Sequence, residues 1–317
     1  TFGYIKGEFK TYCLDIGSIE YDVFISNEDG YYDYVLNFSA LKHVRSEKDP
    51  FTLMRMINVN IFNTEKTLQQ TIQKSSKKYF CVSTDKAANP VNMMGASKRI
   101  MEFFLAQYAQ EISISTARFA NVAFSDGSLL HSFNQRLMKN QPIAAPFDVK
   151  RYFVISKEAG ELCLMSCIFG DAMEIFFPKL EANKHLISLA EVAKNFLRSK
   201  GYEPFECDED EARSSVIKLQ KEKKWPVVFS QSDTTGEKPF EEFFMSHENI
   251  DMDRFSNIGI VKSENTVHHQ KLAEFKNRIL SMQRKKKWTK AEIVELFEET
   301  IPGFGHAEKG KSLDDKM

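Results

Sequence analysis

Short apolar segments alternate with longer amphipathic segments between residues 11 and 178 of this 317-residue chain. The short segments have strand character and cover residues 11–16, 34–39, 78–83, 112–120 and 174–178. The longer segments have apolar residues at helical spacing and cover residues 19–28, 50–73, 94–110 and 157–169. Strands separated by helices of this length pair in parallel through right-handed crossovers. The alternation therefore predicts an α/β protein built on a parallel sheet.

The alternation is less regular after residue 122. We expect a loop over residues 123–150 that contains a short helix near 131–139. Two further strands are predicted at 152–155 and 227–229, and a helix at 189–200. From residue 266 the chain is predicted to be helical up to a polar tail at 305–317. A chain of this length has room for one large domain or two ordinary ones.

The composition argues against several classes of protein. The 43 basic and 44 acidic residues leave a net charge of -1, so no overall field attracts nucleic acid. No apolar run reaches the length of a membrane-spanning helix and no signal peptide is visible, which favours a cytoplasmic protein. The five cysteines have no zinc spacing and the histidines have no metal-binding pattern, so no metal is predicted.

The stretch from Tyr79 to Glu102 combines a strand, a polar strand end, a turn and a helix. The polar strand end carries Thr84, Asp85 and Lys86, and the helix carries Met94 and Lys98 four residues apart on one face. Open α/β sheets place their chemistry where a strand ends and a helix begins. Each residue also has an ordinary structural interpretation. Thr84 would form a strand-end hydrogen bond, Asp85 would cap a turn, and Lys86 would form a salt bridge to Asp85. Met94 would be a core side chain, and Lys98 a solvated helix lysine.

The sequence STDKAANPVNMMGASKR resembles the signature of the nucleotide-sugar 4,6-dehydratases, a branch of the extended short-chain dehydrogenase/reductase superfamily. Four further segments fit the same family, namely FSALKHV (38–44), RFANV (118–122), RYF (151–153) and SDTTGEKPFEEFF (232–244). The resemblance covers essentially the whole chain. It is nearest to the UDP-N-acetylglucosamine 4,6-dehydratases of bacterial polysaccharide and nonulosonic-acid biosynthesis, in their soluble short form associated with legionaminic-acid-type sugars.

This resemblance implies a domain organisation and a cofactor. Residues 1–178 are expected to form part of an NAD-binding Rossmann-type domain, with a substrate-facing insertion near 123–150. Residues 179–317 are expected to form a smaller C-terminal substrate-binding region. No glycine-rich dinucleotide fingerprint occurs in the sequence, and the chain begins at Thr1 without a methionine. We therefore expect an N-terminal truncation that removes the first βαβα portion, in a parent protein that binds NAD tightly.

The family implies an internal redox cycle at the strand end. NAD⁺ takes hydride from sugar C4, water leaves across C5–C6, and the hydride returns to C6. By resemblance, Thr84 orients the C4 hydroxyl, Asp85 protonates the departing C6 hydroxyl, and Lys86 takes the C5 proton. Met94 occupies the position of the superfamily's catalytic tyrosine, and it resembles a subgroup in which methionine is normal. Methionine cannot transfer a proton, so the acid and base roles fall on its neighbours.

The remaining site residues are assigned by resemblance alone. On the cofactor side they are Asp15 and Ile16 for the adenine, Ser39, Ala40 and Leu41 for the pyrophosphate and ribose, Asn60 as a brace of the active-site loop, and Lys98 for the nicotinamide ribose. On the substrate side they are Lys42 and His43 at the mouth, Asn121 at the nucleotide diphosphate, and Arg151 as a diphosphate clamp. Arg118 is equally a candidate for a structural pair with a helix carboxylate.

Two other functions remain open at this stage. A nucleotide-sugar 4-epimerase has the same framework, but it normally needs the tyrosine that Met94 replaces and has less use for an Asp-Lys pair after the threonine. A truncated paralogue that serves only in assembly is the non-enzymatic alternative. The family also implies a homo-oligomer that takes a UDP-sugar as its substrate.

Overall fold

A computed structural model describes the chain outside residues 1–5, 29–31, 172, 234, 263–268 and 307–317. Its largest element is a six-stranded sheet in the order β1-β2-β3-β8-β13-β12. These strands are β1 (Tyr34–Asn37), β2 (Lys78–Thr84), β3 (Ser113–Phe119), β8 (Glu174–Pro178), β13 (Ile258–Lys262) and β12 (Asn249–Asp251). The first four are parallel to one another, and β13 and β12 complete the sheet in antiparallel pairing.

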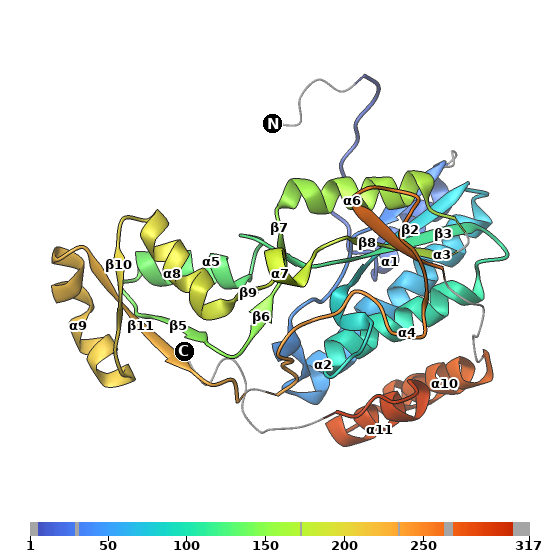
Figure 1. Ribbon diagram of the computed structural model, residues 1–317. Helices are drawn as coiled ribbons and strands as arrows, with labels where there is room; N and C mark the ends of the chain where they lie inside the picture. Colours follow the sequence, from blue (N-terminus) through green and yellow to red (C-terminus); the bar gives the residue numbers. More distant parts are fainter. Residues whose placement is uncertain (1–5, 29–31, 172, 234, 263–268, 307–317) are drawn as a thin grey trace.

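Helices cover both faces of the parallel strands (Figure 1). They are α2 (Pro50–Ile57), the π-helical turn η2 (Asn58–Phe62), α3 (Asn63–Gln73) and α4 (Met93–Gln107) on one side, and α6 (Ser156–Phe169) on the other. Successive residues of β2 point to opposite faces, since Tyr79 packs with α3 and α4 whereas Phe80 packs with α6. Both faces of β2 are therefore buried, which is the usual condition for a parallel strand.

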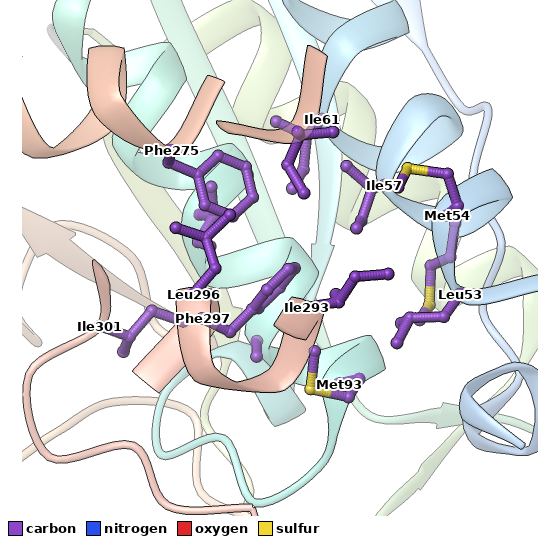
Figure 2. Close-up of a cluster of buried hydrophobic side chains, with 14 of the residues drawn as sticks. Leu53, Met54, Ile57, Ile61, Met93, Phe275, Ile293, Leu296, Phe297 and Ile301 are labelled. Atoms are coloured by element: carbon purple, nitrogen blue, oxygen red, sulfur yellow. The ribbon is translucent and has the colours of Figure 1, made fainter. Parts of the chain in front are cut away.

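Two C-terminal helices form a further layer outside α4 (Figure 1). They are α10 (His269–Lys285) and α11 (Lys290–Thr300), which begins with a capping box between Thr289 and Glu292. Figure 2 shows the apolar cluster that joins them to α2 and α4. At its centre Phe275 of α10 and Phe297 of α11 meet edge to face, with ring centroids 5.2 Å apart.

A smaller lobe stands beside the main sheet (Figure 1). Its three parallel strands have the order β10-β11-β5, namely Glu203–Glu206, Lys224–Ser230 and Ile143–Pro146. Its helices are α5 (Leu129–Met138), α8 (Leu189–Ser199) and α9 (Glu209–Lys221). The fully buried Trp225 and the ring pair of Phe133 and Phe196 fill its core. Five short elements lie between the lobe and the sheet: β4 (Asn121–Val122), β6 (Lys150–Arg151), β7 (Phe153–Val154), α7 (Ala182–His185) and β9 (Ile187–Ser188).

The predicted α/β class is confirmed, and most predicted elements occur near their predicted positions. One strand prediction is wrong, because residues 11–16 form no strand and precede α1 (Ile19–Asn27) as irregular backbone. A strand needs a neighbour to receive its backbone hydrogen bonds. Residues 11–16 pair with no strand in the described part of the chain, and most of them are exposed. The single helix predicted over 50–73 is interrupted by the π-helical turn η2.

The predicted division at residue 178 remains a prediction. The sheet takes β13 and β12 from beyond that residue, and β5 of the smaller lobe comes from before it. The start of the predicted C-terminal helix falls on residues 263–268, outside the described residues. Among the helices that the structure describes, none is both long and apolar enough to cross a membrane.

We predict that Phe297→Ala destabilises the protein by about 3–5 kcal/mol, because truncating a fully buried aromatic side chain leaves a cavity. Urea unfolding followed by tryptophan fluorescence measures the change in the free energy of unfolding. Leu164→Ala on α6 is the control, since this side chain is 53% exposed and should change stability by less than about 0.5 kcal/mol. Equal effects of the two substitutions would contradict the layer formed by α10 and α11.

Candidate active site

Polar segments follow three neighbouring parallel strands where each strand ends. Residues 38–43 follow β1, the Thr84–Lys86 triplet closes β2, and Asn121 follows β3. The carboxyl ends of parallel strands meet at one edge of a sheet, so these segments share that edge. This is the edge at which the sequence predicts the chemistry.

The triplet forms a compact hydrogen-bonded group at the start of η3 (Asp85–Ala87). Oδ1 of Asp85 accepts hydrogen bonds from Thr84 Oγ1 at 2.9 Å and from Lys86 Nζ at 3.0 Å. Oδ2 of Asp85 is buried and has no hydrogen-bond partner among the described residues. The interpretation of Asp85 as a turn cap is wrong, because its carboxylate binds these two side chains and, among the described residues, no backbone N–H. The salt bridge to Lys86 does form.

The triplet packs directly on the N-terminus of α4. Asn92 caps that helix by accepting a hydrogen bond from Gly95 N at 2.8 Å. A Cβ atom at residue 95 would lie 2.4 Å from the carbonyl oxygen of Lys86, so only glycine allows this approach. The glycine of the motif therefore holds the triplet against the helix that carries Lys98.

A second carboxylate reaches the triplet from far along the chain. Glu241 is buried, and its Oε1 lies 3.8 Å from Lys86 Nζ and 3.8 Å from Arg151 Nη2. Burial raises the pKa of the Glu241 carboxyl, Lys86 opposes this shift, and Asp85 adds to it. The sequence reasoning missed this residue. Its only signal was the segment SDTTGEKPFEEFF, which contributed to the resemblance without any role for a single residue.

Arg151 fastens the segment that carries Glu241. Its guanidinium donates to the carbonyl oxygens of Lys150 at 2.8 Å and Lys238 at 2.9 Å, and it lies 3.4 Å from Glu237 Oε1. The side chain is 7% exposed. These partners occupy most of its donors, so the diphosphate clamp predicted for Arg151 remains a prediction.

Lys98 is a buried cation with spare hydrogen-bonding capacity. Its Nζ donates to the carbonyl oxygen of Val82 at 3.0 Å and lies 3.4 Å from the Met101 sulfur. Burial lowers the pKa of Lys98, and the nearby Cys81 and Glu102 act in the opposite direction. The ammonium has three donors, and among the described residues one of them meets an oxygen. The side chain is buried, so an uncommitted donor is available to a hydroxyl group of a bound molecule.

Met94 lies in the apolar cluster shared by α2, α4, α10 and α11. It is 4% exposed, as expected for a core side chain. Its backbone carbonyl accepts a hydrogen bond from Ser97 Oγ at 2.7 Å. Ser97 in turn accepts one from Asn60 Nδ2 at 2.9 Å. The Met94 position is thus tied to the π-helical turn η2.

Asn60 holds the loop after β1 by two hydrogen bonds to one residue. Its Oδ1 accepts from Leu41 N at 2.8 Å, and its Nδ2 donates to Leu41 O at 3.0 Å. At the start of the same loop, Asn37 Oδ1 accepts from Ser39 N at 2.9 Å. The loop that includes Ala40 is therefore fixed by amide side chains at both ends. π-Helical turns are frequent at functional sites, and here the turn supplies the brace.

The other predicted positions lie around this edge in simpler settings. The Asp15 carboxylate accepts a hydrogen bond from Gly17 N at 2.7 Å, while Ile16 is partly buried. Lys42 is exposed. The His43 ring packs on Gly127, where a Cβ would approach within 2.3 Å. Asn121 donates through Nδ2 to the Tyr152 carbonyl at 3.2 Å, between β4 and β7. The roles predicted for these residues remain predictions.

Arg118 is the centre of a buried charge network behind the triplet. Its guanidinium pairs with Glu102 of α4 at 2.7 Å and with Glu248 at 2.8 Å, and it is 0% exposed. Glu102 also accepts a hydrogen bond from Ser83 at 2.6 Å, next to Thr84. The structural pairing of Arg118 with a helix carboxylate is confirmed. Burial opposes the charge of Glu248, but the hydrogen bonds and charge of Arg118 lower its pKa to about 2.

The residues at this edge fit one half of an NAD molecule. The buried Lys98, with an uncommitted donor, suits a ribose hydroxyl, and the fixed loop 39–41 lies after the neighbouring strand. No glycine-rich turn for the pyrophosphate occurs in the sequence. In the part of the chain that the structure describes, no group of three or more His, Cys, Asp or Glu side chains could hold a metal ion.

The chain has the sheet, the strand-end polar groups and the buried helix lysine of a Rossmann-type α/β protein. Residues 15–263 match the model of the family described as "Polysaccharide biosynthesis protein", so the chain belongs to that family.

Curated relatives agree with this membership. An uncharacterized membrane protein of Methanocaldococcus jannaschii is 29% identical over 78% of this chain and 72% of its own length. The capsular polysaccharide biosynthesis protein CapD of Staphylococcus aureus is 31% identical over 53% of this chain and 28% of its own length. A UDP-glucose 4-epimerase of Rickettsia rickettsii is 30% identical over 53% of this chain and 50% of its own length. The chain therefore spans half or less of the last two relatives.

Solved structures support the fold. Pen from Bacillus thuringiensis superposes with a TM-score of 0.64 at 23% identity, covering 85% of this chain and 80% of its own. DesIV, the dTDP-glucose 4,6-dehydratase of Streptomyces venezuelae with NAD and TYD bound, gives a TM-score of 0.55 at 15% identity, covering 72% and 68%. At these identities the likeness confirms the Rossmann-type fold.

We predict that Glu248→Gln costs on the order of 3 kcal/mol of stability at pH 7, because it leaves Arg118 with one carboxylate partner fewer. The folded-state pKa of Glu248 is about 2, below its ordinary value of 4.5. Its stabilisation is therefore complete above about pH 4.5 and is lost as the pH falls towards 2. Urea unfolding at pH 7 and at pH 3 gives the free energy of unfolding of both proteins. The difference in this free energy between Glu248→Gln and the unaltered protein should be smaller at pH 3.

Glu161→Gln is the control for this prediction. Glu161 forms an exposed i,i+4 pair with Lys157 on α6, and its side chain is 61% exposed. Such pairs contribute at most about 0.5 kcal/mol. A difference between Glu248→Gln and the unaltered protein that stays constant from pH 7 to pH 3 would contradict the assigned charge network.

Proposed function

We propose that this chain carries the reaction centre of an NAD-dependent 4,6-dehydratase that converts UDP-N-acetylglucosamine to UDP-2-acetamido-2,6-dideoxy-4-hexulose. Membership of the polysaccharide biosynthesis protein family supports a role in making surface sugars. The likeness to CapD supports the same pathway class. The motif STDKAANPVNMMGASKR supports the dehydratase within that class. The proposal extends to a cytoplasmic homo-oligomer, as the family resemblance implies.

The observation that carries this proposal is the state of the Asp85 carboxyl group. One oxygen is committed to Thr84 and Lys86, and the other is buried with no partner among the described residues. An unpartnered buried carboxyl oxygen is costly, and such exceptions call for a functional explanation. An acid that protonates a departing hydroxyl needs this arrangement, because its free oxygen must face the substrate.

The triplet can perform the elimination with a balanced exchange of protons. Lys86, as a neutral amine, removes the proton from sugar C5, and protonated Asp85 gives its proton to the C6 hydroxyl, which leaves as water. Lys86 is then an ammonium and Asp85 a carboxylate. When C6 has received hydride, the Lys86 ammonium, after exchange with solvent, gives a proton to C5, and Asp85 regains its proton from solvent. The 3.0 Å ion pair of the two residues is then restored. Thr84 orients the C4 hydroxyl through its Oγ1.

The other residues serve binding in this proposal. A bound NAD would accept hydride from sugar C4 and return it to C6. Lys98 would hold the nicotinamide ribose, and residues 39–41 with Asp15 and Ile16 would lie along the rest of the cofactor. The substrate's diphosphate would lie towards the proposed binding residues Lys42, His43, Asn121 and Arg151.

A nucleotide-sugar 4-epimerase is the second candidate. The UDP-glucose 4-epimerase of Rickettsia rickettsii, 30% identical over about half of this chain, favours it. An epimerase needs a proton-transfer group at the C4 hydroxyl, and Met94 cannot serve as one. It also has no use for an acid at C6, whereas Asp85 has a free buried oxygen.

One experiment separates the two functions. The purified protein is incubated with NAD⁺ and UDP-N-acetylglucosamine in D₂O, and the sugar is followed by NMR. A dehydratase gives a C6 methyl signal and one deuteron at C5, because the C5 proton is exchanged with a solvent-derived one. An epimerase gives the C4 epimer with no methyl signal, and that result would refute the proposal.

We predict that Asp85→Asn and Lys86→Ala each lower the dehydration rate by about 10²-fold or more, since general acid and base groups contribute on that scale. Asp171→Asn is the control for the charge change, because its side chain is 77% exposed beside Lys78. Initial rates of methyl formation give the comparison, and urea midpoints verify folding. Full activity in both triplet variants would show that other groups transfer these protons.

A further inference from the structure

Glu241 is a buried carboxylate that the proposed proton transfers do not use. It is 3% exposed, and its Oε1 lies 3.8 Å from the same Nζ of Lys86 that Asp85 contacts at 3.0 Å. The Lys86 ammonium therefore sits between two carboxylates that are more than 150 residues apart in the chain. A buried charge is costly unless it is paired, so the position of Glu241 calls for an explanation.

The segment 236–242 is fastened at several points around the triplet. Asn92 Nδ2, on the cap of α4, donates to Gly236 O at 2.8 Å. Gly236 has φ of +71°, and a Cβ there would lie 2.5 Å from Asn92 Cβ, so glycine permits this close approach. The Pro239 carbonyl accepts from Lys150 N at 2.7 Å. These contacts fix the backbone ahead of Glu241 and so hold its side chain in one position.

The charged groups around this pair come from three segments of the chain. Lys86 faces Asp85 on its own turn and Glu241 on the segment 236–242. Glu241 faces Lys86, Arg151 of β6 at 3.8 Å, and Lys238 at 4.0 Å. Two further carboxylates pair with these cations, Glu237 with Arg151 at 3.4 Å and Glu242 with Lys238 at 3.7 Å. Nζ of Lys238 is buried and has no hydrogen-bond partner in the described residues, so its effect on Glu241 is mainly that of a nearby charge.

We propose that Glu241 is a positioning residue for Lys86, which holds the ammonium beside Asp85 and favours its charged form. The inference rests on the proposed function, since the base role of Lys86 comes from it. A carboxylate 3.8 Å away favours the charged ammonium.

Competitive acylation of Lys86 tests the coupling without any turnover. The protein is labelled with acetic anhydride from pH 7 to pH 10, and the labelled fraction of Lys86 is measured by mass spectrometry. Glu241→Gln keeps the side-chain shape and removes the charge, so the midpoint of labelling should move to lower pH by about one unit or more. A change in accessibility would multiply the rate at every pH and leave the midpoint in place.

Glu242→Gln is the matched control from the next residue. Glu242 accepts a hydrogen bond from Asn89 at 2.8 Å, lies 3.7 Å from Lys238 and has a 46% exposed side chain. Because solvent screens an exposed charge, its substitution should move the labelling midpoint much less than Glu241→Gln. Lys238→Met removes a cation 4.0 Å from Glu241 and should move the midpoint the other way, to higher pH. This opposite shift keeps the test decisive if Glu241→Gln does not fold.

The dehydration assay adds a second readout. In Glu241→Gln the rising limb of the pH–rate profile should move to lower pH together with the labelling midpoint, and Glu242→Gln should move it much less. If the protein dehydrates the substrate but the labelling midpoint does not move in Glu241→Gln or Lys238→Met, the role of Glu241 is overturned. The proposed function would still stand. A moved midpoint in a protein that does not dehydrate would support the coupling and refute the proposed function.

Discussion

The buried guanidinium group of Arg118 joins three parts of the chain that are distant in sequence. It lies on β3, pairs with Glu102 of α4, and pairs with Glu248 from the segment that leads into β12. Its Nη1 also donates to the Phe243 carbonyl at 3.0 Å, two residues after Glu241. A buried cation that loses a partner costs about 3–5 kcal/mol, so all three parts must be in place together. The interaction that fixes α4 therefore also fixes the segment that contacts Lys86.

The loops at the site are held by side chains rather than by further secondary structure. Asn60 binds both backbone groups of Leu41, and its second amide hydrogen binds Ser97 of α4. The π-helical turn η2 changes the direction in which residue 60 points relative to a regular helix, and this lets one amide connect the loop and the helix. A site that is rigid before substrate arrives loses less free energy in ordering its groups during the reaction.

Local patterns in the sequence were sufficient for the triplet, the helix with Lys98 and the parallel sheet, because strand, turn and helix there follow one another within 24 residues. They failed for residues 11–16, whose alternation is that of a strand but which pair with no strand among the residues that the structure describes. They could not find Glu241 either. Its burial depends on contacts such as Asn92 with Gly236, which are separated by 144 residues, and a charge-rich segment otherwise predicts solvent exposure.

The charges around Lys86 suit the chemistry proposed for the triplet. Two carboxylates, Asp85 and Glu241, lie next to the Lys86 ammonium. The neighbouring cations Arg151 and Lys238 have carboxylate partners of their own, Glu237 and Glu242. Removal of a proton next to a ketone places negative charge on the ketone oxygen, and a positive charge held in a buried site stabilises it. The Lys86 ammonium that the proposed elimination forms would therefore favour the enolate while the C6 hydroxyl leaves.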